Sequence, residues 1–265
     1  MTYDRLHDAV LAWYDGTGRD LPWRRTRDPY AILVSEVMAQ QTQVARVLPH
    51  YERWLARWPS PASLAAAAPA DVLAEWVGLG YNRRALRLRE VAAIVAREGW
   101  PRDAAGLRRL PGVGPYTAAA VASFAFGQRV AAVDTNVRRI ARRIGAAPAE
   151  LLPARRHADW NQAAMDLGAR ICTARAPACD ACPAAPWCGS RGRVEVAPRA
   201  ARATAPRFEE TDRWLRGRIV AALAAGGAPP AGIEPARLER VLAGLERDGL
   251  IERDISGVGL PRLPR

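Results

Sequence analysis

The chain has 265 residues, which is long enough for one large domain and one small one. Its formal net charge of +12 and its pI of about 10.7 favour a polyanionic partner. No apolar run reaches the length of a membrane span, and the longest, near residues 118–126, is interrupted by Ser123. The first residues do not resemble a signal peptide, so we expect a cytoplasmic protein that does not bind membranes.

The spacing of apolar residues predicts an almost entirely helical chain. A first helix is expected at residues 4–14, and Asp28-Pro29 begins a second, with no glycine or proline from Ile32 to Val47. No alternating pattern predicts a strand before residue 190. Further helices are expected from residues 60 and 69, and over residues 83–97, 116–126, 135–144 and 154–167.

The end of the chain has a different pattern. Residues 189–208 contain five arginines, two prolines and little periodicity, which is typical of a basic linker. Two predicted helices, 211–223 and 235–248, then precede a hairpin with a β-turn at Ser256-Gly257. This order predicts a small winged-helix-like module that either binds DNA or packs against the main domain.

All four cysteines lie in one short segment, with the spacing C-x6-C-x2-C-x5-C: Cys172, Cys179, Cys182 and Cys188. Four thiolates in one loop suit a tetrahedral metal site or a [4Fe–4S] cluster. Two disulfides are the alternative, but the chain has no other cysteine and no apparent signal peptide. Zinc usually prefers two CxxC pairs, and only one is present. We therefore expect a [4Fe–4S] cluster.

A glycine-rich turn lies between two predicted helices at residues 110–117, Leu-Pro-Gly-Val-Gly-Pro-Tyr-Thr. Glycines let the backbone approach a ligand, and the start of the next helix offers unpaired N–H groups. The segment predicts a site for a DNA phosphate at Gly112, Val113, Gly114 and Thr117. An ordinary turn between helices is the alternative.

Two carboxylates have surroundings that suit catalysis. Asp134 follows an apolar run and precedes a helix, where a helix cap is the simplest interpretation. Glu36 lies among apolar residues of a predicted helix, where burial would raise its pKa and let it hold a proton near neutral pH. That is what a general acid requires, although composition alone favours a surface glutamate. The chain contains no lysine, so no side-chain amine can form a Schiff base.

The glycine-rich hairpin, then Val133-Asp134, then the four cysteines follow the order of the helix-hairpin-helix, Gly-Pro-Asp superfamily of base-excision DNA glycosylases. The chain resembles this superfamily over residues 5–190. Within it, several motifs resemble the adenine glycosylase branch, the MutY family. They are RDLPWR at residues 19–24, DPY at 28–30, SEVMAQQTQV at 35–44, WVGLGY at 76–81 and NQAAMDLG at 161–168.

Together with the pattern of the tail, the resemblance implies an all-α helix-hairpin-helix DNA glycosylase fold with a small winged-helix-like C-terminal module. It also implies a monomer that binds double-stranded DNA with a mispaired adenine, and is therefore associated with the nucleoid. The expected parts are a [4Fe–4S] cluster domain (1–22 and 116–190), a six-helix-barrel domain (23–115), a linker (191–208) and the module (209–265).

The resemblance also assigns catalytic roles. It implies that Glu36 protonates the departing adenine and that Asp134 stabilises the sugar cation. Tyr116 and Asn136 line the same site. Bifunctional relatives have a lysine at the position of Tyr116, so the tyrosine predicts a monofunctional glycosylase that does not cut the strand.

The adenine must leave the helix to be cut. By resemblance, the extruded base is bordered by Trp23, Arg24 and Val44, with Asp166 nearby. Four further residues, called the wedge here, fill the gap and touch the opposite base: Gln41, Thr42, Leu79 and Tyr81. For each of these residues taken alone, core packing is the simpler interpretation.

The chain departs from the family in two places. Ala39 stands where the family usually has leucine, which predicts looser base discrimination. The tail from Thr211 resembles the short tail of some bacterial members rather than the large domain that recognises 8-oxoguanine. Two alternatives stay open, namely a thymine or uracil mismatch glycosylase acting opposite guanine, and a non-catalytic iron–sulfur DNA-binding protein.

Overall fold

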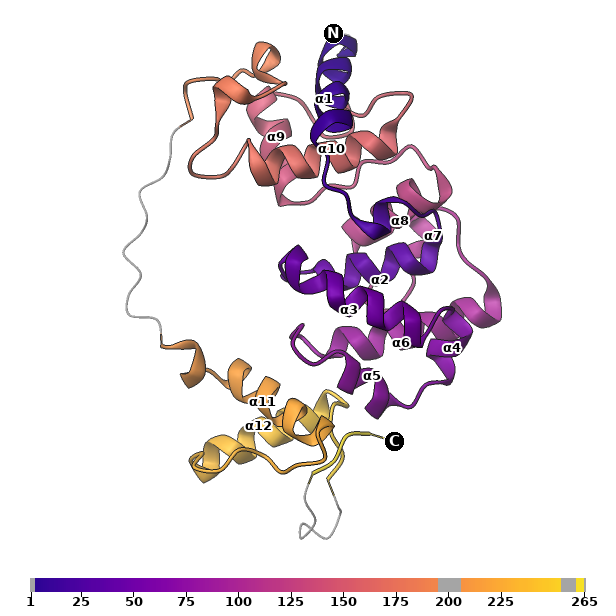
Figure 1. The fold of residues 1–265 in the computed structure, drawn as a ribbon, viewed down its shortest axis with the longest axis vertical. Coiled ribbons are helices and arrows are strands. Elements are labelled where there is room, and N and C mark those ends of the chain that lie inside the picture. Colours follow the sequence, from indigo (N-terminus) through magenta and orange to yellow (C-terminus); the bar gives the residue numbers. More distant parts are fainter. Residues whose placement is uncertain (1–2, 195–205, 254–260, 265) are drawn as a thin grey trace. The chain divides into compact units, whose positions relative to one another are not determined.

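The computed structural model describes residues 3–194, 206–253 and 261–264 (Figure 1). These residues form helices and connecting segments without a β-strand, which confirms the all-α fold. Glu252 and Arg262 form an isolated antiparallel bridge. None of the helices in these ranges has the length and apolar character needed to cross a membrane.

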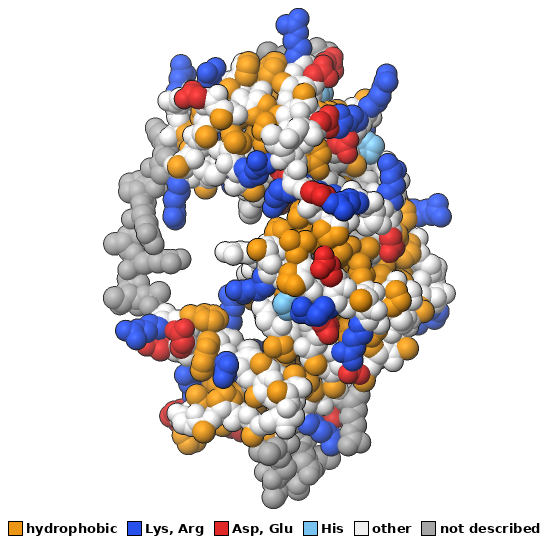
Figure 2. All heavy atoms as spheres, in the orientation of Figure 1, with side chains coloured by type: hydrophobic (Ala, Val, Ile, Leu, Met, Phe, Trp, Pro, Cys, Tyr) orange, Lys and Arg blue, Asp and Glu red, His pale blue; other side chains and the backbone are white. Residues whose placement is uncertain are grey.

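The chain forms two compact units. The first contains residues 1–33 and 100–200, and the second contains residues 34–99 and 201–265. In the view of Figure 2, basic side chains are spread over both units, and acidic and apolar side chains are interspersed among the basic ones. The four-part division expected from the sequence is finer than these two units and stays a prediction.

The first unit is built around three helices: α1 (Asp4–Thr17), α9 (Thr135–Ile144) and α10 (His157–Arg170). Both α1 and α9 pack against α10 (Figure 1), and their buried apolar residues, among them Leu6 and Trp160, form one core. Beside α10 lies α8 (Pro115–Phe126), preceded by the short α7 (Ala104–Leu107). Short 3₁₀ helices occur at Pro22–Arg24, Cys179–Ala181 and Ala185–Trp187.

Helix α10 begins three residues later than the sequence predicts. Arg156 precedes it with a φ of 54°, in the left-handed region. A residue in that conformation cannot continue a right-handed helix, so the helix starts at the next residue. The ion pairs of Arg156 with Asp15 and Asp159 hold this conformation.

The second unit contains α3 (Val44–Arg57), α4 (Pro61–Ala66), α5 (Pro69–Glu75) and α6 (Arg83–Glu98). Helices α4 and α5 both pack against α6. Trp54 is fully buried and meets Trp58 and Trp76 edge-on, with ring centroids 4.7 and 5.4 Å apart. This is a favoured geometry for aromatic pairs.

Helix α2 (Pro29–Ala39) begins in the first unit and continues into the second. It ends well before Val47, although no glycine or proline interrupts the sequence there. Gln41 has a φ of 56°, which breaks the helix, and α3 begins only at Val44. The last carbonyl groups of α2 lack partners within the helix, as at every helix end. Arg84 supplies hydrogen bonds to two of them, those of Val37 and Met38.

The tail also belongs to the second unit. Helix α11 (Asp212–Ala224) packs against α5 and against α12 (Pro235–Arg247), after a 3₁₀ helix at Phe208–Glu210. Both helices lie within one or two residues of their predicted positions. Beyond them, Glu252 and Arg262 exchange backbone hydrogen bonds of 2.8 and 3.0 Å. The predicted β-turn at Ser256-Gly257 and most of the linker lie outside the described residues.

Candidate active site and nucleic-acid interface

In the first unit, Asp134 caps the start of α9. Its Oδ1 accepts a hydrogen bond from the backbone N–H of Val137 at 2.7 Å, and its Oδ2 accepts one from Asn136 Nδ2 at 2.9 Å. Both oxygens therefore have a fixed donor, and the carboxylate is held in one orientation. The structure thus brings together two of the four predicted catalytic residues, Asp134 and Asn136.

The extended segment that leads to Asp134 is held by Asn161 of α10. This side chain is 2% exposed, donates to Ser123 Oγ at 3.0 Å and to the Val130 carbonyl at 2.9 Å, and accepts from the Ala132 N–H at 3.1 Å. A buried amide with all these partners fixes the backbone it binds. Asn161 lies in a motif noted in the sequence, but its role was not predicted.

A second chain of hydrogen bonds joins Asp134 to the cysteine segment through Arg139. Asn136 Oδ1 accepts from Arg139 Nη2 at 2.7 Å, and Arg139 also donates to the carbonyls of Gly168 at 2.6 Å and Cys172 at 2.8 Å. Gly168 permits this approach of α10 to α9, because an added Cβ would lie 2.5 Å from Asn136 Cβ. The cysteine segment therefore helps to position the carboxylate.

The four cysteines, Cys172, Cys179, Cys182 and Cys188, line one small pocket, and all four are free thiols. Arg143 Nη1 donates to the sulfur of the first at 3.1 Å. Burial raises the pKa of the Cys182 thiol, and the other three thiols nearby raise it further. Within the described ranges, no group of three or more His, Cys, Asp or Glu residues is arranged to hold a metal ion. The structure thus places all four predicted cysteines around one pocket.

Asp166 lies at the centre of a buried ionic network. It is fully buried and accepts hydrogen bonds from Arg19, 2.8 and 2.6 Å, and from Arg24, 2.9 and 2.7 Å. Burial by itself raises the pKa of Asp166, but the hydrogen bonds from Arg24 and Arg19 outweigh it and hold the pKa at about 2. Asp166 therefore orients Arg24, which was predicted to border the base, and Trp23 precedes it in the same 3₁₀ helix.

Two glycines shape the predicted phosphate site before α8. Gly112 has a φ of 73°, which favours glycine, and a Cβ at Gly114 would meet no atom within 4 Å, so the start of α8 is open to a ligand. The side chains of Val113 and Thr117 are buried, and the Val113 N–H donates to the Leu110 carbonyl at 3.2 Å. The hydroxyl of Tyr116, in the first turn of α8, donates to Met165 Sδ at 3.4 Å.

In the second unit, Glu36 lies on α2 with buried residues on both sides in sequence, Ser35 and Val37, and is itself only partly exposed. Val44, predicted to border the base, is the partly buried first residue of α3.

The wedge residues occupy two adjacent turns with unusual backbone. Gln41 and Tyr81 have φ values of 56° and 50°, and Arg156 is the only other non-glycine residue of the described ranges with a positive φ. Such conformations cost about 1–3 kcal/mol and cluster at functional sites. Thr42 Oγ1 donates to the Leu79 carbonyl at 3.3 Å, so the two turns touch. Tyr81 is 44% exposed, whereas the Leu79 side chain is buried in the core.

Arg84 connects these two turns and was missed in the sequence. Its guanidinium donates to five carbonyl oxygens: Val37, Met38, Gln40, Leu79 and Gly80. Burial lowers the pKa of Arg84 to about 10, and no carboxylate of the described residues forms an ion pair with it. The only signal in the sequence was an arginine shortly after the WVGLGY motif.

Comparisons with known proteins agree with this arrangement. Residues 34–159 match the family model described as HhH-GPD superfamily base excision DNA repair protein. The adenine DNA glycosylase of Mycobacterium tuberculosis is 42% identical over 280 residues, covering 94% of this chain and 90% of the relative.

Among solved structures, a thermostable thymine-DNA glycosylase has a TM-score of 0.66 and 29% identity, covering 70% of this chain and 94% of that one. A trapped covalent intermediate of endonuclease III with DNA has a TM-score of 0.61 and 25% identity, covering 74% of this chain and all of that one.

The Asp166 network predicts a large and pH-dependent loss of stability. Asp166→Asn leaves two arginines without their buried partner and is expected to lower the free energy of unfolding by about 3 kcal/mol at pH 7, measured by urea unfolding. The folded-state pKa lies below the ordinary value of 3.8. The contribution of this carboxylate in the wild type is therefore complete above about pH 4 and is lost as the pH falls toward 2. Asp159→Asn, on the same helix but exposed, should cost less than about 1 kcal/mol.

The contacts of Arg84 predict that its removal destabilises the second unit. Arg84→Ala removes the hydrogen bonds that its guanidinium donates to five carbonyls, and we expect unfolding to become easier by about 3 kcal/mol in urea. Arg87→Ala is the control, because Arg87 lies on the same helix and pairs only with Glu90 at the surface. Equal effects of the two changes would contradict the role given to Arg84.

Proposed function

Because this chain belongs to the adenine DNA glycosylase family, within the HhH-GPD superfamily, we propose that it removes adenine mispaired with 8-oxoguanine or guanine. The similarity to an adenine DNA glycosylase over 94% of the chain is the observation on which the proposal depends. The protein acts in base excision repair, binds double-stranded DNA and leaves an abasic site. We expect it to act as a monomer in the nucleoid.

Glu36 serves as the general acid. Adenine is a poor leaving group as an anion, and a proton on N7 lets it depart neutral. The position of Glu36 on α2, partly exposed between two buried residues, supports this role.

Asp134 stabilises the positive charge that develops on the sugar. Its two fixed hydrogen bonds keep the carboxylate in place, so no reorganisation is needed when the charge appears. Asn136 contributes one of those bonds and so positions Asp134, while Tyr116 lines the same site.

The reaction then balances as a hydrolysis. Glu36 gives its proton to N7, and the bond between C1′ and N9 breaks with its electron pair passing to adenine. Water adds to C1′ and releases a proton, which restores the acid. A Schiff base would need an amine, and the chain has no lysine, so the enzyme is monofunctional.

One set of residues borders the extruded base, and a second set fills the gap that the base leaves in the helix. Trp23, Arg24 and Val44 border the extruded adenine, and Asp166 holds Arg24. The wedge, Gln41, Thr42, Leu79 and Tyr81, fills the gap and contacts the opposite base; the strained turns of Gln41 and Tyr81 and the exposure of the tyrosine ring support this role. The turn with Gly112, Val113 and Gly114 and the start of α8 with Thr117 bind a DNA phosphate.

The four cysteines, Cys172, Cys179, Cys182 and Cys188, hold a [4Fe–4S] cluster. Their spacing and their shared pocket support this proposal. Hydrolysis of the base has no redox step, so the cluster supplies structure. Through Arg139, the loop that it orders supports Asp134.

A second candidate function is removal of thymine or uracil opposite guanine. The structural similarity to a thymine-DNA glycosylase favours it, as does Ala39 at the end of α2, whose side chain is smaller than the leucine usual in the family. The similarity of almost the whole chain to an adenine glycosylase makes it the weaker candidate.

Glu36→Gln tests the general acid. Base release from adenine opposite 8-oxoguanine, followed in a single turnover, should fall by about 10³-fold, while DNA affinity changes little. Glu52→Gln, an exposed position on α3, should leave both unchanged. Equal loss of DNA binding and base release in Glu36→Gln would show that the residue is not the acid.

Iron analysis tests the cluster. Protein purified without oxygen should contain about four iron and four sulfide ions per chain, and Cys182→Ser should lose most of them. Stoichiometric zinc with no sulfide would contradict the assignment.

A further inference from the structure

The wedge of the second unit is in contact with the C-terminal tail. Helix α11 packs against α5, and the guanidinium carbon of Arg213, in the first turn of α11, lies over the ring of Tyr81 at 4.2 Å from its centroid. Arg84 lies near the same ring, at 5.7 Å. The exposed tyrosine of the wedge is therefore bordered by an arginine that comes from the other end of the sequence.

These two arginines differ in what they can still bind. The guanidinium of Arg84 is directed to five backbone carbonyls. Arg213 is exposed and, among the described residues, its recorded contact is the Tyr81 ring. A guanidinium over a ring keeps its N–H edge available for acceptors in the same plane.

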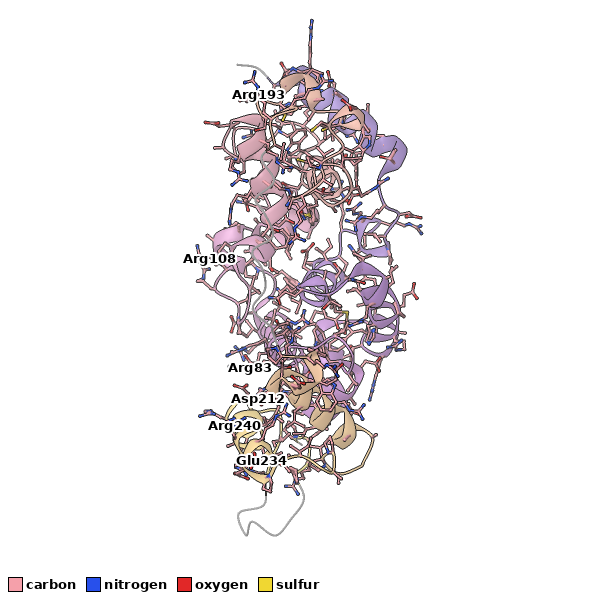
Figure 3. The ribbon with its side chains drawn as sticks, turned by 90° about the vertical axis from the view of Figure 1, so that its left-hand side faces the viewer. Arg83, Arg108, Arg193, Asp212, Glu234 and Arg240 are labelled. Atoms are coloured by element: carbon pink, nitrogen blue, oxygen red, sulfur yellow. The ribbon has the colours of Figure 1, made fainter. Side chains whose placement is uncertain are left out.

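Two acidic residues in or against α11 are paired with other arginines. Asp212, the next residue, pairs with Arg237 at 3.2 Å and with Arg240 at 3.3 Å, and the latter pair is visible in Figure 3. Asp248 pairs with Arg83 and Arg216. Within the described part of the chain Arg213 forms no ion pair, so its exposed guanidinium can bind an acceptor from outside the protein.

We propose that Arg213 is a specificity-determining residue that binds the purine opposite the target adenine. The proposal rests on the proposed function, because Tyr81 is taken to touch that opposite base. A guanidinium fork matches the adjacent acceptors O6 and N7 of guanine, and 8-oxoguanine carries an additional carbonyl oxygen. The tail thus contributes to recognition of the opposite base, and its packing on α5 sets the position of Arg213.

The experiment measures binding of the full chain to three duplexes. Each contains a 2′-fluoro adenine nucleotide, which keeps its base, placed opposite 8-oxoguanine, guanine or a tetrahydrofuran abasic analogue. The three share the same phosphates and differ only in the opposite base, so a preference for the purine duplexes over the abasic one isolates base contact from phosphate contact.

Arg213→Ala should weaken binding to both purine duplexes by about tenfold and to the abasic duplex by less than about twofold. Arg213→Lys keeps the charge without the fork, and should match the wild type on the abasic duplex but not on the purines. Arg218→Ala is the matched control, because Arg218 lies on the same helix beside Trp214. It should affect all three duplexes equally and slightly. Unchanged thermal unfolding of each variant confirms that the fold is intact.

Equal loss on all three duplexes would show a phosphate contact and overturn the proposal. It would also be overturned by a wild type without purine preference, by unchanged binding in Arg213→Ala, or by full purine preference in Arg213→Lys. Failure of the proposed function is seen separately, as a wild type that releases no adenine from an unmodified duplex of adenine opposite 8-oxoguanine.

Discussion

The guanidinium of Arg84 determines how the second unit presents its surface to a substrate. By binding carbonyls at the end of α2 and in the turn at residues 79–80, it holds together two segments that are about 40 residues apart in sequence. The strained conformations of Gln41 and Tyr81 can persist because these contacts offset their cost. Glu36, one turn earlier on α2, is fixed by the same arrangement.

In the first unit, helix α10 holds neighbouring segments in position, as Arg84 does in the second unit. Asn161 binds the segment that leads to Asp134, Gly168 lets α9 approach, and Asp166 aligns the two arginines that precede α2. One helix thus positions Asp134, the carboxylate that we propose to be catalytic, and a predicted contact of the base. The proposed hydrolysis needs only a few groups, and buried polar contacts hold Asp134 and Arg24 in place.

Local patterns predicted the helices and the Asp134 cap well, because each depends on residues close in sequence. The break after α2 was not predicted, since it depends on a positive φ at Gln41 and on Arg84, more than 40 residues away. Leu79 and Thr117 were predicted as contact residues from motifs, and the burial of their side chains was not predicted. The contact between Arg213 and Tyr81 joins distant parts of the chain, and no local pattern indicates it.

Single-turnover base release from four duplexes tests the account most directly. They contain adenine opposite 8-oxoguanine, adenine opposite guanine, thymine opposite guanine and uracil opposite guanine, and alkali reveals each abasic site. We expect rapid cleavage at adenine in the first two and none at thymine or uracil. Cleavage at thymine or uracil alone would show that the pocket accepts a different base, and tight binding without any cleavage would contradict the catalytic roles of Glu36 and Asp134.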